Sequence, residues 1–292
     1  MLRRASVFPS PVLLVLALIV AAATASAAPR AEPWERWTAH APTSTARIDH
    51  ADWNGFLKKY VRPGADGINR LPYGAVSKAD KASLKAYIRR LGKTSVGRYN
   101  RAEQFAFWVN LYNAATVNLM LDSYPVRSIR DIDTSPGLLA DGPWGRKLVS
   151  VEGEPLSLDD IEHRILRPVW RDPRIHYVVS CAAVGCPNLA PRALTAANKE
   201  ALLDRAARDY INHPRGVNKR GSRLYLSKIY KWYRDDFGGG EAGVIDHLSR
   251  YARPALAAGI RDAKGIGGYV YDWALNDCPA PDQSSCSTSD LR

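Results

Sequence analysis

The sequence predicts one α+β domain over residues 49–276. Candidate helices and short strands mix along the chain without the regular strand-helix alternation of a doubly wound sheet. One helix candidate, residues 101–122, is apolar on nearly every side and should therefore lie in the interior. Apolar residues make up 46% of the 292-residue chain, which is enough for a core that needs no disulfides to replace it.

The first 27 residues are predicted to be a signal peptide. Arg3 and Arg4 precede an apolar run at residues 12–23, which is too short to span a membrane, and residues 25–27 read Ala-Ser-Ala, a small-x-small cleavage pattern. An uncleaved anchor is the alternative. No later segment approaches the roughly 20 apolar residues of a membrane span. We expect an exported protein, periplasmic or secreted, with a loose lead-in at residues 28–48.

The first structured elements are expected from helical spacing and a cap. Residues 49–60 place four bulky apolar side chains on one side of a helix. Residues 68–76 resemble a strand or extended segment. Ser77 and Asp80 form a capping box that opens a helix ending near Leu91. The apolar side chains of the first helix are Trp53, Phe56, Leu57 and Tyr60.

Three polar residues interrupt the buried helix at 101–122. Glu103, Asn110 and Asn113 are separated by seven and three positions, which puts them roughly along one side. Buried polar groups must be hydrogen-bonded or they cost a few kcal/mol each. These residues therefore either tie the helix to neighbouring loops or line a site.

The second half of the chain alternates short elements with turns. Ser157 and Asp160 form a second capping box, and Pro168 and Pro173 are expected to end the helix that it opens. The expected elements are a loop at 124–146, a hairpin at 147–156, a helix at 158–167, a buried strand at 175–180, a helix at 195–211, a strand at 224–226, a turn or helix at 229–237, a helix at 244–251, a hinge-like turn at 265–268 and a final strand at 269–275.

Two thiols and an imidazole converge at residues 175–189. Cys181 and Cys186 follow the predicted strand that His176 begins, and His163 lies on the preceding helix. A catalytic thiolate needs a nearby histidine, helix N-terminus or cation. In an ideal strand His176 and Cys181 would point to opposite faces, so a direct pair is not favoured by local geometry. Glu103, Glu162, Asn110 or Asn113 could orient the base.

Three other interpretations of these thiols remain open. In an oxidising compartment Cys181 and Cys186 could pair with each other, and Cys278 with Cys286 in the Pro/Ser-rich tail at 277–292. The two thiols with His163 and His176 could instead bind zinc, although the C-x4-C spacing is weak for a metal site. A thiol-redox role is weak for the same reason, because the C-x-x-C spacing is absent.

The formal net charge of +12 falls to about +10 without Arg3 and Arg4. Long basic runs and interleaved aromatic-basic stripes are absent, so the sequence does not indicate nucleic-acid binding. A basic exported protein more plausibly meets anionic surfaces or acidic small molecules, unless the charge is only solvated arginine. No phosphate-binding loop, G-x-S-x-G or H-E-x-x-H motif is present, and we expect no metal or cofactor.

Five motifs, spaced in order, resemble the domain-of-unknown-function family numbered 547, in its exported bacterial branch. The resemblance covers about residues 77–276. It implies a relation to papain-like cysteine hydrolases, a central helix packed on a small, mostly antiparallel sheet, and thiol-peptide or glutathione-like substrates. Some plant relatives lack the thiols, which suggests that the fold can serve binding alone. The motifs are A-F-W-V-N-L-Y-N-A (106–114), I-E-H-R-I-L-R (161–167), I-H-Y-V-V-S-C-A-A-V-G-C-P (175–187), L-S-K-I-Y-K-W-Y-R-D-D-F (226–237) and Y-D-W-A-L-N (271–276).

The leading hypothesis is an exported hydrolase that cleaves an amide bond of a small peptide or thiol peptide. Asn110 stands where a papain-type helix would begin with cysteine, so the nucleophile must come from the 181–186 loop. The rival is a non-catalytic envelope binding module with structural disulfides. The expected catalytic residues are Cys181, Cys186, His176, His163, Glu103 and Asn110, and the expected substrate-binding residues are Asn113, Glu162 and Lys228.

Overall fold

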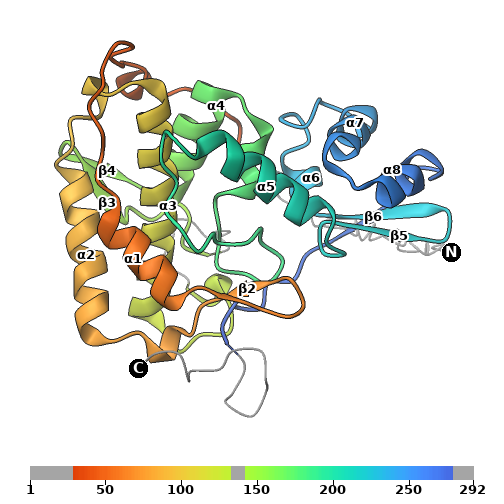
Figure 1. The fold of residues 1–292 in the computed structure, drawn as a ribbon, viewed down its shortest axis with the longest axis horizontal. Helices are drawn as coiled ribbons and strands as arrows, with labels where there is room; N and C mark the ends of the chain where they lie inside the picture. Colours follow the sequence, from red (N-terminus) through yellow and green to blue (C-terminus); the bar gives the residue numbers. More distant parts are fainter. Residues whose placement is uncertain (1–28, 133–141, 279–292) are drawn as a thin grey trace, which may run out of the picture.

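Two groups of elements form the molecule: a larger helical part and a smaller sheet part built around three strands (Figure 1). The computed structural model describes residues 29–132 and 142–278. Each part has its own cluster of buried apolar side chains. The mixed α+β class predicted from the sequence is confirmed. The predicted signal peptide and Cys286 lie outside the described residues.

The helical part begins with elements that the sequence predicted closely. The four predicted apolar side chains of α1 (Ala51–Tyr60) are all buried. Ser77 caps α2 (Lys78–Gly92), because its Oγ accepts from the backbone N–H of Asp80 at 3.1 Å. The predicted hairpin is present as β3 (Val149–Val151) and β4 (Glu154–Leu156). Short elements in the 68–76 region are β2 (Asn69–Arg70), which pairs with β1 (Arg62–Pro63), and the 3-10 helix Tyr73–Ala75.

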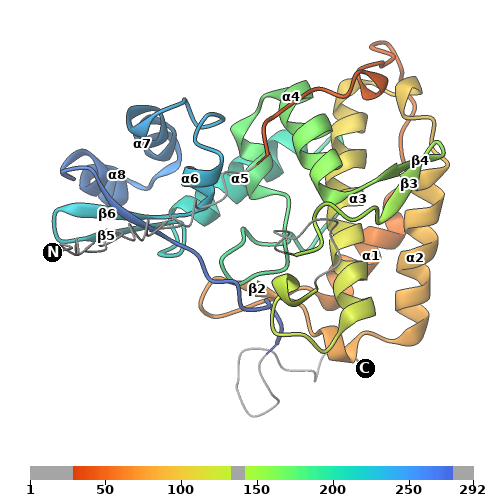
Figure 2. The ribbon, with the colours of Figure 1, turned by 180° about the vertical axis from the view of Figure 1, so that it is seen from behind.

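Helix α3 (Arg101–Ser123) runs through the centre of the helical part (Figure 2). Asn100 caps it, because its Oδ1 accepts from the backbone N–H groups of Ala102 and Glu103. Every residue from 103 to 117 is buried, as its apolar composition predicted. However, α3 packs mainly against α2 and the helix after β4, not on the three-stranded sheet. The expected packing of the central helix on a sheet is therefore wrong.

The helix after β4 does not stop at Pro168. A π-helical segment (Asp160–Leu166) continues directly into α4 (Arg167–Trp170), with the proline in the first turn of α4. A proline and a π turn leave carbonyls without their usual helical partners. The carbonyls of His163 and Arg164 accept instead from the backbone N–H groups of Glu32 and Trp34, at 3.1 and 2.9 Å. The lead-in segment is thus bonded to this helix and is not loose as predicted.

The segment at 175–180 is not a strand. Residues Pro173–Tyr177 form a 3-10 helix, Val178 continues it as a turn, and the two residues before Cys181 belong to no helix or strand. Asp172 caps this turn by accepting from the backbone N–H of Arg174 at 2.9 Å, and the fixed φ of Pro173 suits a first helical turn. This cap and proline override the apolar run that favoured a strand.

The sheet part has strand order β5-β6-β7, with β5 and β6 antiparallel and β6 and β7 parallel. The predicted turn at 265–268 is largely strand β7, and β5 and α8 were not predicted. Helix α5 begins four residues later than expected and lies between the two parts (Figure 1). The elements are α5 (Lys199–Ile211), β5 (Val217–Arg220), β6 (Arg223–Ser227), α6 (Ile229–Trp232), α7 (Glu241–Tyr251), α8 (Pro254–Arg261) and β7 (Ile266–Val270).

Within residues 29–132 and 142–278, none of the helices combines the length and apolar composition needed to cross a bilayer.

Candidate functional site

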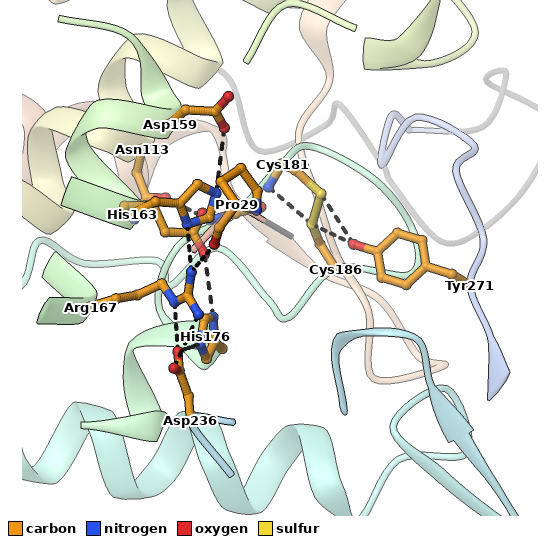
Figure 3. A network of polar contacts seen from close by, with 12 residues as sticks. Pro29, Asn113, Asp159, His163, Arg167, His176, Cys181, Cys186, Asp236 and Tyr271 are labelled. Atoms are coloured by element: carbon orange, nitrogen blue, oxygen red, sulfur yellow. Dashed lines mark hydrogen bonds and ion pairs between the residues drawn. A yellow bond between two sulfur atoms is a disulfide. The ribbon is translucent and has the colours of Figure 1, made fainter. Parts of the chain in front are cut away.

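Cys181 and Cys186 are joined in a disulfide, with their Cα atoms 6.2 Å apart (Figure 3). Cys186 is 3% exposed, whereas Cys181 is half-buried. A bonded sulfur is not a thiolate, so neither cysteine can act as a nucleophile in this form. The disulfide interpretation left open by the sequence is the one that the structure shows.

Two donors face the sulfurs. The backbone N–H of Cys181 donates to Cys186 Sγ at 3.0 Å. The hydroxyl of Tyr271, from the segment after β7, lies 3.1 Å from each sulfur. Burial raises the pKa of Tyr271 well above its usual value, so the hydroxyl keeps its proton and can donate. The disulfide therefore sits in a small polar enclosure within an otherwise buried region.

Residues 178–186, which include both cysteines and are called the cysteine loop below, are held in place by contacts on two sides. The Asn113 side chain of α3 donates to the Val178 carbonyl at 2.7 Å and accepts from the Ser180 N–H at 2.9 Å. On the other side, the Gly185 N–H donates to the Asp272 carbonyl at 2.8 Å. A Cβ at Gly185 would lie 2.7 Å from the Asp272 nitrogen, so the close approach requires glycine. Asn113, predicted to bind substrate, positions the loop.

His176 belongs to an ionic cluster, defined here as Glu162, His163, Arg167, His176 and Asp236, of which all but Asp236 are buried (Figure 3). His176 Nε2 lies 2.7 Å from Asp236 Oδ2, and Nδ1 lies 3.3 Å from Glu162 Oε1. The second contact is an ion pair by distance whose angles do not make a hydrogen bond. Burial opposes the charge of His176, but the two carboxylates outweigh burial and raise its pKa.

Arg167 joins the rest of the cluster. Its Nε and Nη2 donate to the two carboxylate oxygens of Asp236 at 2.6 and 3.1 Å. Its Nη1 donates to the Pro29 carbonyl at 2.7 Å and lies 3.1 Å from His163 Nδ1. Because guanidinium nitrogens only donate, His163 Nδ1 must be the acceptor. Nε2 of His163 then faces Asp159 Oδ1 at 3.5 Å.

The carboxylates of the cluster stay ionised although Glu162 is buried and Asp236 is partly buried. Burial alone would raise the pKa of Glu162, but the electrostatic influence of His163, the contact with His176 and the charge of Arg167 lower it to about 2. His176 and Arg167 likewise hold the pKa of Asp236 far below its usual value against the effect of burial. A buried carboxylate is stable only when it is paired in this way.

The predicted thiol-imidazole pair is not brought together. Within the described residues, the imidazoles of His163 and His176 contact carboxylates, a guanidinium and aromatic rings, and neither imidazole bonds a sulfur. Glu162, expected to orient a base or bind substrate, is paired inside the cluster. Glu162 of the cluster acts electrostatically on Tyr271 beside the disulfide, since its charge contributes to the raised pKa of Tyr271.

The remaining predicted residues make structural contacts. Glu103 Oε2 accepts from the Ile48 N–H at 3.1 Å. Asn110 donates to the Leu194 carbonyl at 2.7 Å and accepts from the Leu194 N–H at 3.1 Å. Both residues thus tie α3 to neighbouring loops, one of the two roles that the sequence left open. Lys228 precedes α6, and its backbone N–H donates to the Val270 carbonyl.

Part of the chain, including α3 and both cysteines of the disulfide, matches a known protein family. Residues 96–211 match DUF547. The family's description is "Protein of unknown function, DUF547", so the match assigns no activity. No curated protein and no solved structure matches the chain. The resemblance inferred from the motifs is therefore confirmed for the DUF547 region, which spans α3, the cysteine loop and α5. Asp236 and Tyr271 lie beyond it.

A pocket of about 330 Å³ opens beside α3 in the DUF547 region. The sequence singled out Asn110 and Asn113 as candidate site residues but did not predict the pocket, because the other walls of the pocket come from distant segments. Apolar side chains form most of the wall and charged side chains stand at exposed positions. The main lining residues are Trp53 and Leu57 of α1, Val109, Asn110 and Asn113 of α3, Asn188–Arg192 and Leu194 of the loop, and Leu202, Arg205, Ala206, Asp209 and Tyr210 of α5.

The four residues considered as zinc ligands do not gather around a common point. The sulfurs of Cys181 and Cys186 are bonded to each other, and His163 and His176 face carboxylates in the ionic cluster. No cluster of histidine, cysteine and acidic side chains with the geometry of a metal site occurs in the part of the chain that the structure describes. The zinc interpretation has no support from this arrangement.

Proposed function

We propose that this protein binds a small, largely apolar anion in the pocket between α1, α3, α5 and residues 188–194. The observation that carries the proposal is the pocket itself, about 330 Å³ with mostly apolar walls and a few polar groups. Such concave apolar sites with sparse polar groups are typical of small-molecule binding. This function corresponds to the binding module with structural disulfides that the sequence offered as an alternative.

Two amides in the pocket wall can fix the orientation of a ligand. Asn110 and Asn113 each use one N–H and the carbonyl oxygen to hold a backbone segment. A primary amide has a second N–H and a second lone pair. A bound molecule could use these remaining groups without breaking the hydrogen bonds that Asn110 and Asn113 make to the loops.

The charges near the pocket favour an anion. Arg192 and Arg205 are exposed lining residues, and Asp209 is the one acidic residue among the lining residues described. The Arg205–Asp209 pair is exposed and long, at 3.6 Å, so it contributes little and leaves the guanidinium available. The net charge of +12 adds a long-range attraction for acidic molecules.

Anilinonaphthalene sulfonate, an apolar anion, is expected to bind the folded protein with enhanced fluorescence. Ala206→Trp should abolish this binding, because an indole would occupy the space beside Tyr210 and Leu202. Arg192→Gln with Arg205→Gln should weaken binding roughly fivefold to tenfold, since an exposed charge contributes up to about 1 kcal/mol. Fluorescence titration of variants with unchanged circular dichroism measures both effects.

Two controls separate the pocket from general dye adsorption. Arg208→Gln removes an exposed positive charge from the same helix outside the pocket, and it should leave the affinity unchanged. Phenylnaphthylamine, which lacks the sulfonate, should be insensitive to the loss of Arg192 and Arg205. Wild-type affinity in Ala206→Trp would show that the dye binds elsewhere and would remove the basis of the proposal.

The cysteine-dependent hydrolase remains a hypothesis that requires a reduced protein. The pairing of Cys181 with Cys186 predicts that the native protein, prepared without reductant, shows no maleimide labelling at either residue. Peptide mapping by mass spectrometry checks this. Two labelled cysteines with turnover of glutathione or dipeptides, lost in Cys181→Ser, would instead favour the hydrolase. The same assay tests the papain-like relation implied by the resemblance, which turnover dependent on Cys181 would support and its absence would not.

Export is part of the proposal. The N-terminal pattern of basic residues, apolar run and Ala-Ser-Ala supports it, and so does a disulfide, because disulfides persist mainly in oxidising compartments. Export to the periplasm or the medium would also place the pocket among envelope metabolites. Detection of a mature N-terminus at Ala28 in protein recovered from outside the cytoplasm would test this directly.

A further inference from the structure

We propose that the Cys181–Cys186 disulfide is redox-active and exchanges with low-molecular-weight thiols. This activity is separate from ligand binding in the pocket. It is carried by three features of the loop: unequal exposure of the two cysteine residues, two hydrogen-bond donors within reach of Cys186 Sγ, and a half-buried guanidinium, that of Arg215, which forms no ion pair with a carboxylate of the described residues.

The exposures of the two cysteine residues indicate which sulfur an incoming thiol attacks. Cys181 is half-buried, whereas Cys186 is 3% exposed. An incoming thiolate therefore meets Cys181 Sγ. Exchange proceeds by attack of a thiolate on one sulfur with the other as leaving group, so Cys186 is the leaving thiolate in this geometry.

The surroundings of Cys186 suit a leaving thiolate. The backbone N–H of Cys181 donates to Cys186 Sγ at 3.0 Å, and the Tyr271 hydroxyl lies 3.1 Å from the same sulfur. This hydroxyl keeps its proton because burial raises the pKa of Tyr271. Hydrogen bonds to an ionised acceptor are stronger than those to a neutral one. Both donors thus stabilise the charge that forms on Cys186 more than they stabilise the intact disulfide.

Arg215 supplies a positive field on the same side. Its Nη1 donates to the Val184 carbonyl at 2.8 Å and its Nη2 to Asn188 Oδ1 at 2.6 Å, so the guanidinium spans the loop that contains Cys186. Its Nε is buried without a hydrogen-bond partner. Among the ion pairs of the described residues, none involves Arg215. Cations near a cysteine lower the free energy of the thiolate.

Groups of both signs act at this point. After burial, the groups that shift the pKa of the Tyr271 hydroxyl are Tyr210, Arg215, Glu162 and Asp272, and of these only Arg215 lowers it. Arg215 is therefore the group among these four that favours an anion beside the sulfurs, and it acts against Glu162 and Asp272.

The reaction balances with two thiols as reductant. The first thiolate attacks Cys181 Sγ, forming a mixed disulfide while the Cys181–Cys186 bond breaks and its electron pair leaves on Cys186. A second thiolate attacks the sulfur of the bound thiol and displaces Cys181 as a thiolate. Two thiols are oxidised to one disulfide, and the protein gains two electrons and, from water, two protons.

The test uses the folded full chain with reduced glutathione at millimolar concentration, followed by acid quenching and peptide mapping. Glutathione is expected on Cys181 with a free thiol on Cys186, without denaturant. Tyr271→Phe should slow the exchange about threefold to tenfold, because it removes one hydrogen bond to the leaving thiolate. Tyr269→Phe, the same change two residues earlier, should react at the wild-type rate.

Arg215 is tested through its charge. Arg215→Lys should retain faster exchange and a less negative reduction potential than Arg215→Gln, whereas a purely structural role would make the two variants alike. The proposal is overturned if the wild-type bond resists glutathione until the protein is unfolded, if glutathione appears on Cys186, or if Tyr271→Phe reacts as fast as wild type. The wild-type experiment needs no variant to fold and decides the matter alone.

Discussion

Arg167→Met is expected to lower the free energy of unfolding by about 3–5 kcal/mol, the usual cost of removing one partner from a buried ion pair. The guanidinium is 6% exposed and makes a two-point contact with Asp236. Methionine fills much of the same space, so the loss is mainly electrostatic. Asp236, His163 and the Pro29 carbonyl would each lose a partner inside the molecule.

Urea unfolding followed by circular dichroism measures this loss. Arg164→Met is the matched control, since Arg164 lies one turn earlier, is 44% exposed and pairs with Asp160 at 3.3 Å. It should cost no more than about 1 kcal/mol. Equal losses in the two variants would mean that the cluster does not stabilise the fold as its geometry implies. The double variant Arg167→Met with Asp236→Asn should lose less than the two single variants added together, because they share one interaction.

Elements governed by local signals were predictable from the sequence. The cap at Ser77, the apolar face of α1 and the all-round apolar character of α3 each determine structure within a few residues. These elements form where expected because no distant contact opposes them. The α+β class follows from the same signals.

Elements decided by distant contacts were not predictable in this way. Pro168 does not end its helix because the carbonyls that it affects accept hydrogen bonds from Glu32 and Trp34 of the lead-in. At residues 175–180 the apolar run favoured a strand, but the cap at Asp172 and Pro173 imposes a helical turn. Hydrophobic pattern alone cannot separate a buried strand from such a segment.

The candidate site shows the same division. The sequence drew attention to Cys181, Cys186, His163 and His176, yet their partners Asp236 and Tyr271 come from up to 90 residues away. Arg215, which bonds the Val184 carbonyl between the two cysteines, is distant in sequence as well. Asp236 and Tyr271 do stand within the motifs at 226–237 and 271–276, which was the one available signal. The expectation of a thiol-imidazole pair rested on closeness in sequence. In the fold, the imidazoles pair with carboxylates and the sulfurs with each other.

The stability of the protein is expected to be greatest near pH 6.5 and to fall on both sides. Burial lowers the pKa of His50 and of His247 from 6.5 to about 4, so the unfolded chain binds protons that the folded chain does not. Stability therefore falls as the pH drops from 6.5 towards 4, by on the order of 3 kcal/mol for each histidine. His176 acts in the opposite sense: its raised pKa adds stability below pH 6.5 that is lost as the pH rises through its folded value.

A second acid step comes from the ionic cluster. The pKa of Glu162 falls from 4.5 to about 2 on folding, so its contribution is complete above pH 4.5 and is lost as the pH falls towards 2. At about 1.4 kcal/mol for each pH unit, this is a loss of about 3 kcal/mol. Asp236, whose pKa is also lowered, adds to the same step.

Urea unfolding at a series of pH values separates the two steps through matched variants. His247→Phe keeps the ring contacts with Phe237 and Tyr251 but cannot titrate, so it should remove about half of the loss of stability between pH 6.5 and 4, the rest belonging to His50. Glu162→Gln should flatten the limb below pH 4.5. The exposed substitutions His40→Asn and Glu35→Gln should leave the profile unchanged. A profile that keeps its wild-type shape in both buried variants would show that these groups do not set the acid stability, and that the charges attributed to the ionic cluster are wrong.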